Sequence, residues 1–127
     1  MAQPNEVNKF KGISIIIPVL NERENISELI QRIVSTMVVT RYRFEIVFIN
    51  DHSSDNTRKT IEKYADVYPI RVYNKKGPPG KAQSILEGVG RAKYDLICMI
   101  NGDLQYPPEA IRLMVNKIEE GNDVVIA

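Results

Sequence analysis

Two aspartates have the surroundings expected of groups that take part in chemistry. Asp51 and Asp103 each come just after a short apolar run, and an asparagine, Asn50 or Asn101, lies close before each. Mg²⁺ and Mn²⁺ take oxygen ligands, and one or two carboxylates together with substrate phosphates can hold such an ion. The position of Asp103 therefore predicts a divalent metal site. The alternative is a purely structural turn, because Asn-Gly-Asp is also a sequence that a tight loop prefers.

Asp51 suggests a second kind of contact. A carboxylate accepts hydrogen bonds, so it suits the imino N–H of uracil or of guanine. The structural alternative is that Asp51 only caps its own loop.

The segment Gly77-Pro-Pro-Gly80-Lys81 suggests an anion site. Glycine permits close backbone approach, and a helix N-terminus attracts phosphate groups. The segment is not a Walker A motif, which needs four residues between its glycines and Ser or Thr after the Lys. No G-x-G-x-x-G follows the first apolar run, which argues against a nicotinamide cofactor.

Composition and charge exclude several classes of protein and of binding site. The 127 residues are 43% hydrophobic and 26% charged, as in one soluble globular domain, and the net charge of +1 predicts no nucleic-acid partner. His52 and Cys98, the single residues of their types, are too few for a zinc site. With one cysteine we expect a cytoplasmic protein. No apolar run approaches the roughly 20 residues of a transmembrane segment.

Five β-like runs, separated by helical patterns or turns, must position these residues. The runs cover residues 13–17, 44–49, 70–73, 96–100 and 123–127. Such alternation predicts an α/β fold, a Rossmann-like and mostly parallel sheet with helices on both faces. The first run is nearly all apolar and β-branched, as in a strand covered on both faces, and we expect it to stop at Pro18.

Four apolar stripes at helical spacing predict the helices. The residues expected to face inward are Ile26, Leu29, Ile30, Ile33, Val34 and Met37; Ile61, Tyr64, Ala65 and Tyr68; Ala82, Ile85, Leu86 and Val89; and Ile111, Met114, Val115 and Ile118. We expect Ser54 or Asp55 to cap the second helix and Lys81 to open the third. Pro107 and Pro108 suit the first turn of the fourth.

Polar clusters follow the first four strands. Asn21 and Glu22 follow the first, and residues 50–55, 74–76 and 101–105 follow the others. Ligands of open parallel sheets bind at the carboxyl ends of the strands. The pattern therefore predicts one binding site at that edge.

At these clusters the chain resembles glycosyltransferase family 2, which has the GT-A fold, and within it the polyprenyl-phosphate sugar transferases related to dolichol-phosphate mannose synthase. The motifs are Ile16-Ile-Pro-Val-Leu-Asn-Glu22, Ile49-Asn-Asp-His-Ser-Ser-Asp-Asn-Thr57, Gly80-Lys-Ala82 and Asn101-Gly-Asp-Leu-Gln-Tyr-Pro-Pro-Glu109. Their order and spacing agree from about Ile13 to Ala127. The resemblance implies an enzyme that binds a UDP- or GDP-sugar through Mg²⁺ or Mn²⁺. It also implies inverting transfer to an acceptor, a polyprenyl phosphate or a growing glycan.

The resemblance also implies roles for single residues. Asp103 would hold the metal, with Gln105 and Asn101 as further oxygen donors. The implied nucleotide contacts are Pro18, Val19, Asn21, Glu22, Asp51, Lys81, Gly102 and Asp103. From the residues alone, Asn21 and Glu22 could equally cap the first helix, and Asp55 and Thr57 would shape the start of the second.

Two departures from the family pattern each remove a carboxylate. The family usually has Asp-Asp where this chain has Asn50-Asp51, and Asp-X-Asp where it has Asn101-Gly102-Asp103. The aspartates retained are those that face the base and the metal in relatives, so we expect binding to survive, weakened. His52 stands where Gly or Asn is usual.

The resemblance places the general base and the acceptor site beyond Ala127. We expect residues 1–12 to be an N-terminal extension and residues 13–127 to be the nucleotide-sugar-binding domain, which binds a nucleotide but does not transfer sugar by itself. The full-length protein would associate with the cytoplasmic face of a membrane. Two alternatives stay open: a non-catalytic nucleotide-binding module, which the lost carboxylates favour, and a flavodoxin-like domain.

Overall fold

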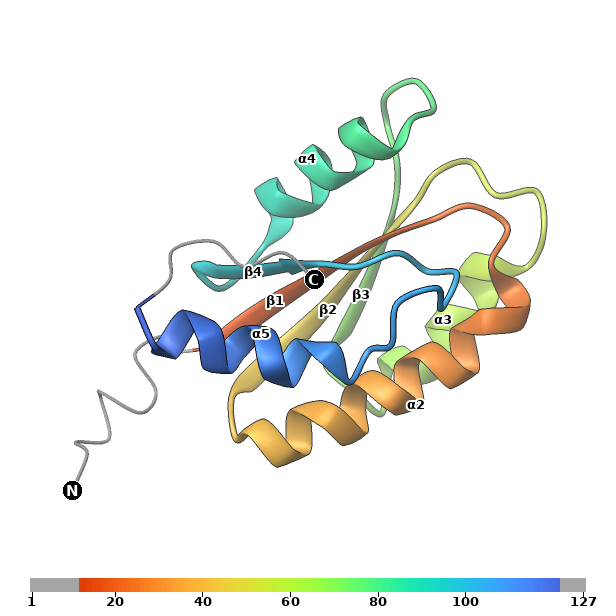
Figure 1. Cartoon of the computed structure of the whole chain (residues 1–127). Helices are drawn as coiled ribbons and strands as arrows, with labels where there is room; N and C mark the ends of the chain where they lie inside the picture. The colour runs from red at the N-terminus through yellow and green to blue at the C-terminus, as the bar shows by residue number, and fades with distance from the viewer. Residues whose placement is uncertain (1–11, 122–127) are drawn as a thin grey trace.

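A computed structural model describes residues 12–121, which form a parallel sheet between helices (Figure 1). In chain order the elements are β1 (Gly12–Val19), α2 (Arg23–Thr40), β2 (Arg43–Asn50), α3 (Thr57–Ala65), β3 (Ile70–Asn74), α4 (Lys81–Arg91), β4 (Leu96–Met99) and α5 (Ala110–Glu119). The strand order is β3-β2-β1-β4, and every neighbouring pair is parallel. The predicted α/β fold is confirmed. The expected strand over 123–127 lies outside the described residues.

The helices are divided unequally between the two faces of the sheet. α2, α3 and α5 lie on one face and α4 lies alone on the other (Figure 1). Side chains alternate along a strand. Ile13, Ile15 and Ile17 accordingly belong to the main core on the three-helix side, whereas Ile16 belongs to a smaller cluster under α4. Both faces of β1 are therefore buried, as its β-branched sequence predicts.

β1 does not stop at Pro18 but continues to Val19. Ile16 O accepts a hydrogen bond from Ile100 N on the β4 side, and Val19 O accepts one from Asp51 N on the β2 side. Because successive residues point their backbone groups to opposite sides, Pro18 faces the β4 side. β4 has already ended at Met99, so the missing N–H of Pro18 breaks no ladder bond.

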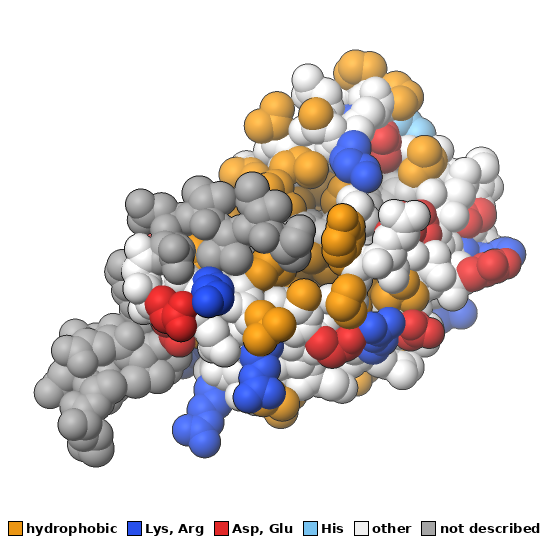
Figure 2. Space-filling model, viewed as in Figure 1, with side chains coloured by type: hydrophobic (Ala, Val, Ile, Leu, Met, Phe, Trp, Pro, Cys, Tyr) orange, Lys and Arg blue, Asp and Glu red, His pale blue; other side chains and the backbone are white. Residues whose placement is uncertain are grey.

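The inward face predicted for α4 is wrong. Leu86 is 65% exposed and Val89 is 42% exposed, Ala82 is exposed as well, and the buried positions are Ser84 and Gly88. A Cβ added at Gly88 would lie 2.2 Å from Ile16 Cγ2, so the helix backbone rests directly on β1. The close contact turns the larger apolar side chains outward. On the face seen in Figure 2, apolar side chains gather over α4.

Three smaller expectations also differ from the structure. The N-cap residue of α3 is Asn56, but Asp55 still accepts the N–H of Thr57 at 2.9 Å, so the role predicted for Asp55 in shaping the helix start is confirmed. Tyr68 packs against the core from beyond the end of α3. Pro107 and Pro108 form a turn before α5 rather than its first helical turn.

The inward stripe predicted for α2 is confirmed, because its members are buried or packed against the core. In α5, Ile111 and Val115 are buried and Met114 packs against the core, whereas Ile118 is half-buried and lies outside the core cluster. α4 begins at Lys81, as predicted. Within residues 12–121, no helix has the length and apolar character required to span a membrane.

Candidate functional site

A cavity of about 260 Å³ opens at the carboxyl ends of β1, β2 and β4 and at the start of α4. It is lined by Pro18, Val19, Leu20, Glu22, Asp51, Pro79, Gly80, Lys81, Asn101, Gly102 and Asp103. All the residues predicted to bind nucleotide or metal are among them, except Asn21 and Gln105. Four loops that are distant in sequence therefore supply three carboxylates and one lysine to one space.

Asn21 joins two loops instead of lining the cavity. Its backbone is left-handed, with φ of 53°. Its Oδ1 accepts the N–H of Ser54 at 2.8 Å, and its own N–H donates to Ser53 Oγ at 3.0 Å. The loop after β1 is in this way held against the loop after β2.

Glu22 is the N-cap residue of α2, but its side chain does not cap the helix. Its carboxylate accepts Asn25 Nδ2 at 2.7 Å, and its N–H donates to Thr57 Oγ1 at 3.0 Å. The side chain is half-buried and contributes to the cavity wall. Glu22 therefore stays available for a ligand.

Gly102 lets the loop after β4 reach the end of β1. A Cβ at this position would lie 2.9 Å from Val19 Cγ1 and 3.4 Å from Glu22 Cγ. Only a residue without a side chain fits this close approach. Gly102 thus brings its neighbours Asn101 and Asp103 to the cavity.

Asp103 lies in a tight turn and at the cavity wall at the same time. Its Oδ1 accepts the N–H of Gln105 at 3.1 Å, and Leu104 between them has φ of 62°. Gln105 is exposed and lies outside the cavity lining. The turn geometry and a ligand role are therefore compatible for Asp103.

The donor set suits a hard divalent cation bound together with a ligand. Among residues 12–121 no group of three or more His, Cys, Asp or Glu could hold a metal by itself. Asp103 and Asn101 at the cavity nevertheless supply oxygen donors, and Mg²⁺ or Mn²⁺ often binds one or two carboxylates plus substrate phosphates. The residues fit a metal that arrives with a diphosphate.

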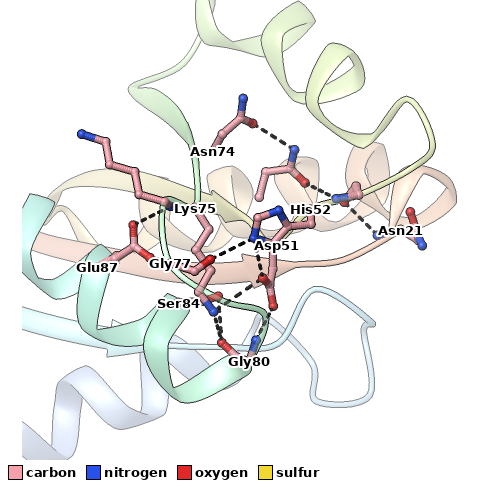
Figure 3. Close-up of polar contacts among 12 residues, drawn as sticks. Asn21, Asp51, His52, Asn74, Lys75, Gly77, Gly80, Ser84 and Glu87 are labelled. Carbon is pink, nitrogen blue, oxygen red and sulfur yellow. Dashed lines mark hydrogen bonds and ion pairs between the residues drawn. The ribbon is translucent and has the colours of Figure 1, made fainter.

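Asp51 lies at the inner wall and meets a buried lysine (Figure 3). Its Oδ2 accepts the N–H of Gly80 at 3.0 Å, and Lys75 Nζ lies 3.5 Å from its Oδ1. The Lys75 side chain is 0% exposed and also donates to Gly80 O. Asp51 and Lys75 thus hold Gly80, whose φ of 146° strongly favours glycine, at the start of α4.

Lys75 had no role in the sequence-based prediction. The only signal was its place in the polar cluster at 74–76, directly after a strand. A lysine at such a position is normally solvated. Its burial against Asp51 depends on the packing of β3 beside β2, which no local pattern predicts.

The surroundings of Asn50 explain why an asparagine stands where the family usually has the first aspartate of Asp-Asp. Its Nδ2 donates to Asn74 Oδ1 at 3.1 Å, across the ends of β2 and β3. An ionised aspartate could not donate this bond and would face another oxygen.

His52 ties the Gly77 loop to the site. It has a left-handed φ of 63°, and its Nε2 lies 3.0 Å from Gly77 O. The side chain is 49% exposed, whereas those of Asp51 and Lys75 are almost fully buried.

Comparisons with known proteins identify the family of this chain. Residues 14–127 match the model of the family described as Glycosyl transferase family 2. The chain is 34% identical over 114 residues to a dolichol-phosphate mannosyltransferase of Pyrococcus furiosus. The aligned region covers 90% of this chain and 32% of that protein. It is 33% identical over 120 residues to an undecaprenyl-phosphate 4-deoxy-4-formamido-L-arabinose transferase of Proteus mirabilis, covering 92% and 36%. The chain thus spans about a third of the length of these relatives.

Solved structures share the fold. The mannosyltransferase PcManGT of Pyrobaculum calidifontis, in complex with GDP-Man and Mn²⁺, superposes with a TM-score of 0.73 at 19% identity over 91% of this chain and 34% of that one. Glucosyl-3-phosphoglycerate synthase of Mycobacterium tuberculosis, in complex with UDP, gives 0.73 at 20% identity over 96% and 47%. At these identities the likeness establishes the GT-A fold. The match of residues 14–127 to the family model shows that this chain belongs to glycosyl transferase family 2.

Proposed function

We propose that this segment is the donor-binding part of an inverting glycosyltransferase that takes a nucleoside diphosphate-sugar together with a divalent metal. The observation that carries the proposal is the cavity where Asp51, Lys81 and Asp103 meet, at the carboxyl ends of parallel strands. Ligands of open α/β sheets bind at this place.

Each residue has a role that follows from its position. Lys81 opens α4, where its charge adds to the helix N-terminus as an attraction for the diphosphate. Asp103 and Asn101 would hold Mg²⁺ or Mn²⁺, which when bound neutralises charge on the diphosphate leaving group. Asp51 accepts a hydrogen bond from the base. Pro18, Val19 and Glu22, which also line the cavity, would lie next to the base and ribose.

The acceptor follows from the relatives. Two of them are transferases named for dolichol phosphate and undecaprenyl phosphate, so we propose a polyprenyl phosphate acceptor for the whole enzyme. We expect the general base that removes the acceptor's proton to lie outside residues 12–121. A cavity of about 260 Å³ is below the range of roughly 300–1,000 Å³ typical of ligand pockets, consistent with a site that holds part of the donor.

The test is a calorimetric titration with UDP and with GDP, each with and without Mn²⁺. We expect binding of at least one diphosphate that requires Mn²⁺ and is lost in Asp103→Ala. The matched control is Asp95→Ala, which removes one exposed carboxylate away from the cavity and should bind like the unmodified chain.

The outcomes separate the alternatives. Binding that is independent of Mn²⁺ and unaffected by Asp103→Ala would favour a non-catalytic nucleotide-binding module. Absence of binding of either diphosphate would contradict the proposal. Sugar transfer to a polyprenyl phosphate by the 127-residue chain would show that the general base is within it.

A further inference from the structure

The segment between β3 and α4 reaches the cavity with few contacts of its own. Residues 79–81 line the cavity, and Gly80 is held by the buried ion pair described above. Within the described part of the chain, residues 77–79 make a single hydrogen bond. His52 supplies it, from Nε2 to Gly77 O at 3.0 Å (Figure 3). One side chain from the loop after β2 therefore holds the middle of this segment.

The loop that carries His52 is fixed on both sides of it. Asp51 N donates to the last carbonyl of β1 at 2.8 Å, and Ser53 N donates to Asn50 Oδ1 at 3.4 Å. His52 itself has a left-handed φ of 63°, a conformation that glycine adopts freely and that a residue with a side chain adopts at a cost. A glycine would suit this backbone better, but it would have no group to hold Gly77.

Two prolines connect Gly77 to the cavity wall. The ring of proline fixes φ, so Pro78 and Pro79 form a stiff connection rather than a flexible one. A hydrogen bond at Gly77 therefore restricts Pro79 and Gly80 as well. Lys81 follows directly, in the first turn of α4.

The hydrogen bond explains the position of the ring better than a charge interaction does. His52 Nε2 lies 4.0 Å from Asp51 Oδ1, beyond hydrogen-bond distance, and Lys75 Nζ lies closer to that oxygen, at 3.5 Å. The carbonyl of Gly77 can only accept, so Nε2 carries the proton, as it can in the neutral ring and does in the cation. The contact with Gly77 therefore does not require a charged ring.

We propose that His52 is a positioning residue for the donor. Its hydrogen bond to Gly77 orders the Gly77–Gly80 segment in the free protein, so Lys81 already stands at the cavity wall when a nucleoside diphosphate arrives. Ordering a loop in advance raises affinity, because the entropy of ordering it is not lost on binding. The inference rests on the donor binding proposed above, but the ordering itself is a property of the free chain.

The experiment measures two quantities in the full chain and in the variants His52→Gly and His52→Gln. One is the hydrogen exchange rate of the Gly80 N–H, followed by NMR without ligand, and the other is calorimetric binding of UDP and of GDP with Mn²⁺. We expect His52→Gly to exchange this N–H roughly threefold to tenfold faster and to bind the diphosphate more weakly by a similar factor, which corresponds to one hydrogen bond. The side-chain amide of His52→Gln can donate to the same carbonyl without a charge, so it should restore most of both losses.

Arg41→Gly is the matched control. Arg41 also has a left-handed φ, of 65°, and it is exposed. It lies between α2 and β2, whereas the cavity is at the other end of the strands. Glycine at this position relieves the same kind of backbone conformation without touching the Gly77–Gly80 segment. It should leave both the exchange of the Gly80 N–H and the binding of the diphosphate unchanged.

Unchanged exchange or unchanged binding in His52→Gly would overturn the inference. A His52→Gln protein as impaired as His52→Gly, or an equal effect of Arg41→Gly, would overturn it too, because the hydrogen bond would then not be the cause. If the unmodified chain binds neither diphosphate with Mn²⁺, the proposed function fails and the donor role of His52 fails with it. The exchange of the Gly80 N–H, measured without ligand, still decides whether His52 orders the segment.

Discussion

At the scale of single residues, the pairing of Lys75 with Asp51 is the most consequential feature of the site. The lysine side chain is fully buried, and the carboxylate 3.5 Å away is the nearby charge that compensates it. A buried charge is tolerated when it is paired. The same pair fixes Gly80 through both its N–H and its carbonyl oxygen.

Removing one member of this pair should cost far more than removing both. We expect Lys75→Met to lower the free energy of unfolding by about 3–5 kcal/mol, because it leaves the Asp51 carboxylate buried and uncompensated. The double variant Lys75→Met with Asp51→Asn should recover part of that loss. Urea unfolding of the two single variants and the double variant measures the coupling. Additive losses would show that the two side chains do not depend on each other.

At the scale of elements, α4 is placed by Gly88 rather than by its larger apolar side chains. Gly88 rests on Ile16, so the helix lies close to the sheet and its first turn, beginning at Lys81, reaches the cavity. Leu86 and Val89 are turned outward as a consequence. The position of Lys81 thus depends on a contact about two helical turns away.

The two glycines of this helix offer a matched comparison. Gly88→Ala should lower the free energy of unfolding by about 1–3 kcal/mol, because its methyl group would overlap Ile16. Gly90→Ala has nothing within 4 Å of the added Cβ and should raise it by about 0.5–1 kcal/mol through helix propensity. Thermal or urea unfolding of both variants measures the loss of stability expected for Gly88→Ala and the gain expected for Gly90→Ala. An unchanged free energy of unfolding for Gly88→Ala would contradict this expectation, because it would mean that α4 can move away from the sheet without loss of stability.

At the scale of the whole molecule, one buried carboxylate connects three strands at the end of the sheet opposite the cavity. Glu45 in β2 accepts hydrogen bonds from Ser14 Oγ in β1, from the N–H of Lys93 before β4, and from Arg71 in β3. Burial by itself raises the pKa of Glu45, but these hydrogen bonds and the positive charge of Arg71 outweigh it and hold the pKa below its ordinary value.

A depressed pKa in the folded state makes stability depend on pH in one direction. The contribution of Glu45 is fully present above the pKa of an unfolded glutamate, about 4.3, and is lost as the pH falls through the lower folded value. We expect Glu45→Gln to be less stable than the unmodified chain by roughly 1–3 kcal/mol at pH 7, with the difference shrinking below about pH 4. Urea unfolding of both proteins from pH 3 to pH 7 measures this difference in the free energy of unfolding. The exposed Glu62→Gln is the control, and a Glu45→Gln deficit that does not change with pH would contradict the assignment.

The sequence alone determined the fold and the edge of the sheet that holds the cavity. Strand periodicity, β-branched runs and turn residues are local properties, and the alternation of strands with helices allows few arrangements. The polar clusters after each strand marked the correct edge because parallel strands end on the same side. Asp51 and Asp103 were identified by the same argument.

Tertiary structure decided which side chains at that edge are free to act. Asn21 became a bridge between loops and Lys75 entered the interior, because both results depend on contacts between segments far apart in the chain. The outward turn of Leu86 has the same cause: helical spacing shows that an apolar stripe exists, but the close contact of Gly88 with Ile16 decides which side of α4 meets the sheet. Local patterns record propensity, whereas burial and pairing are settled only when the elements pack.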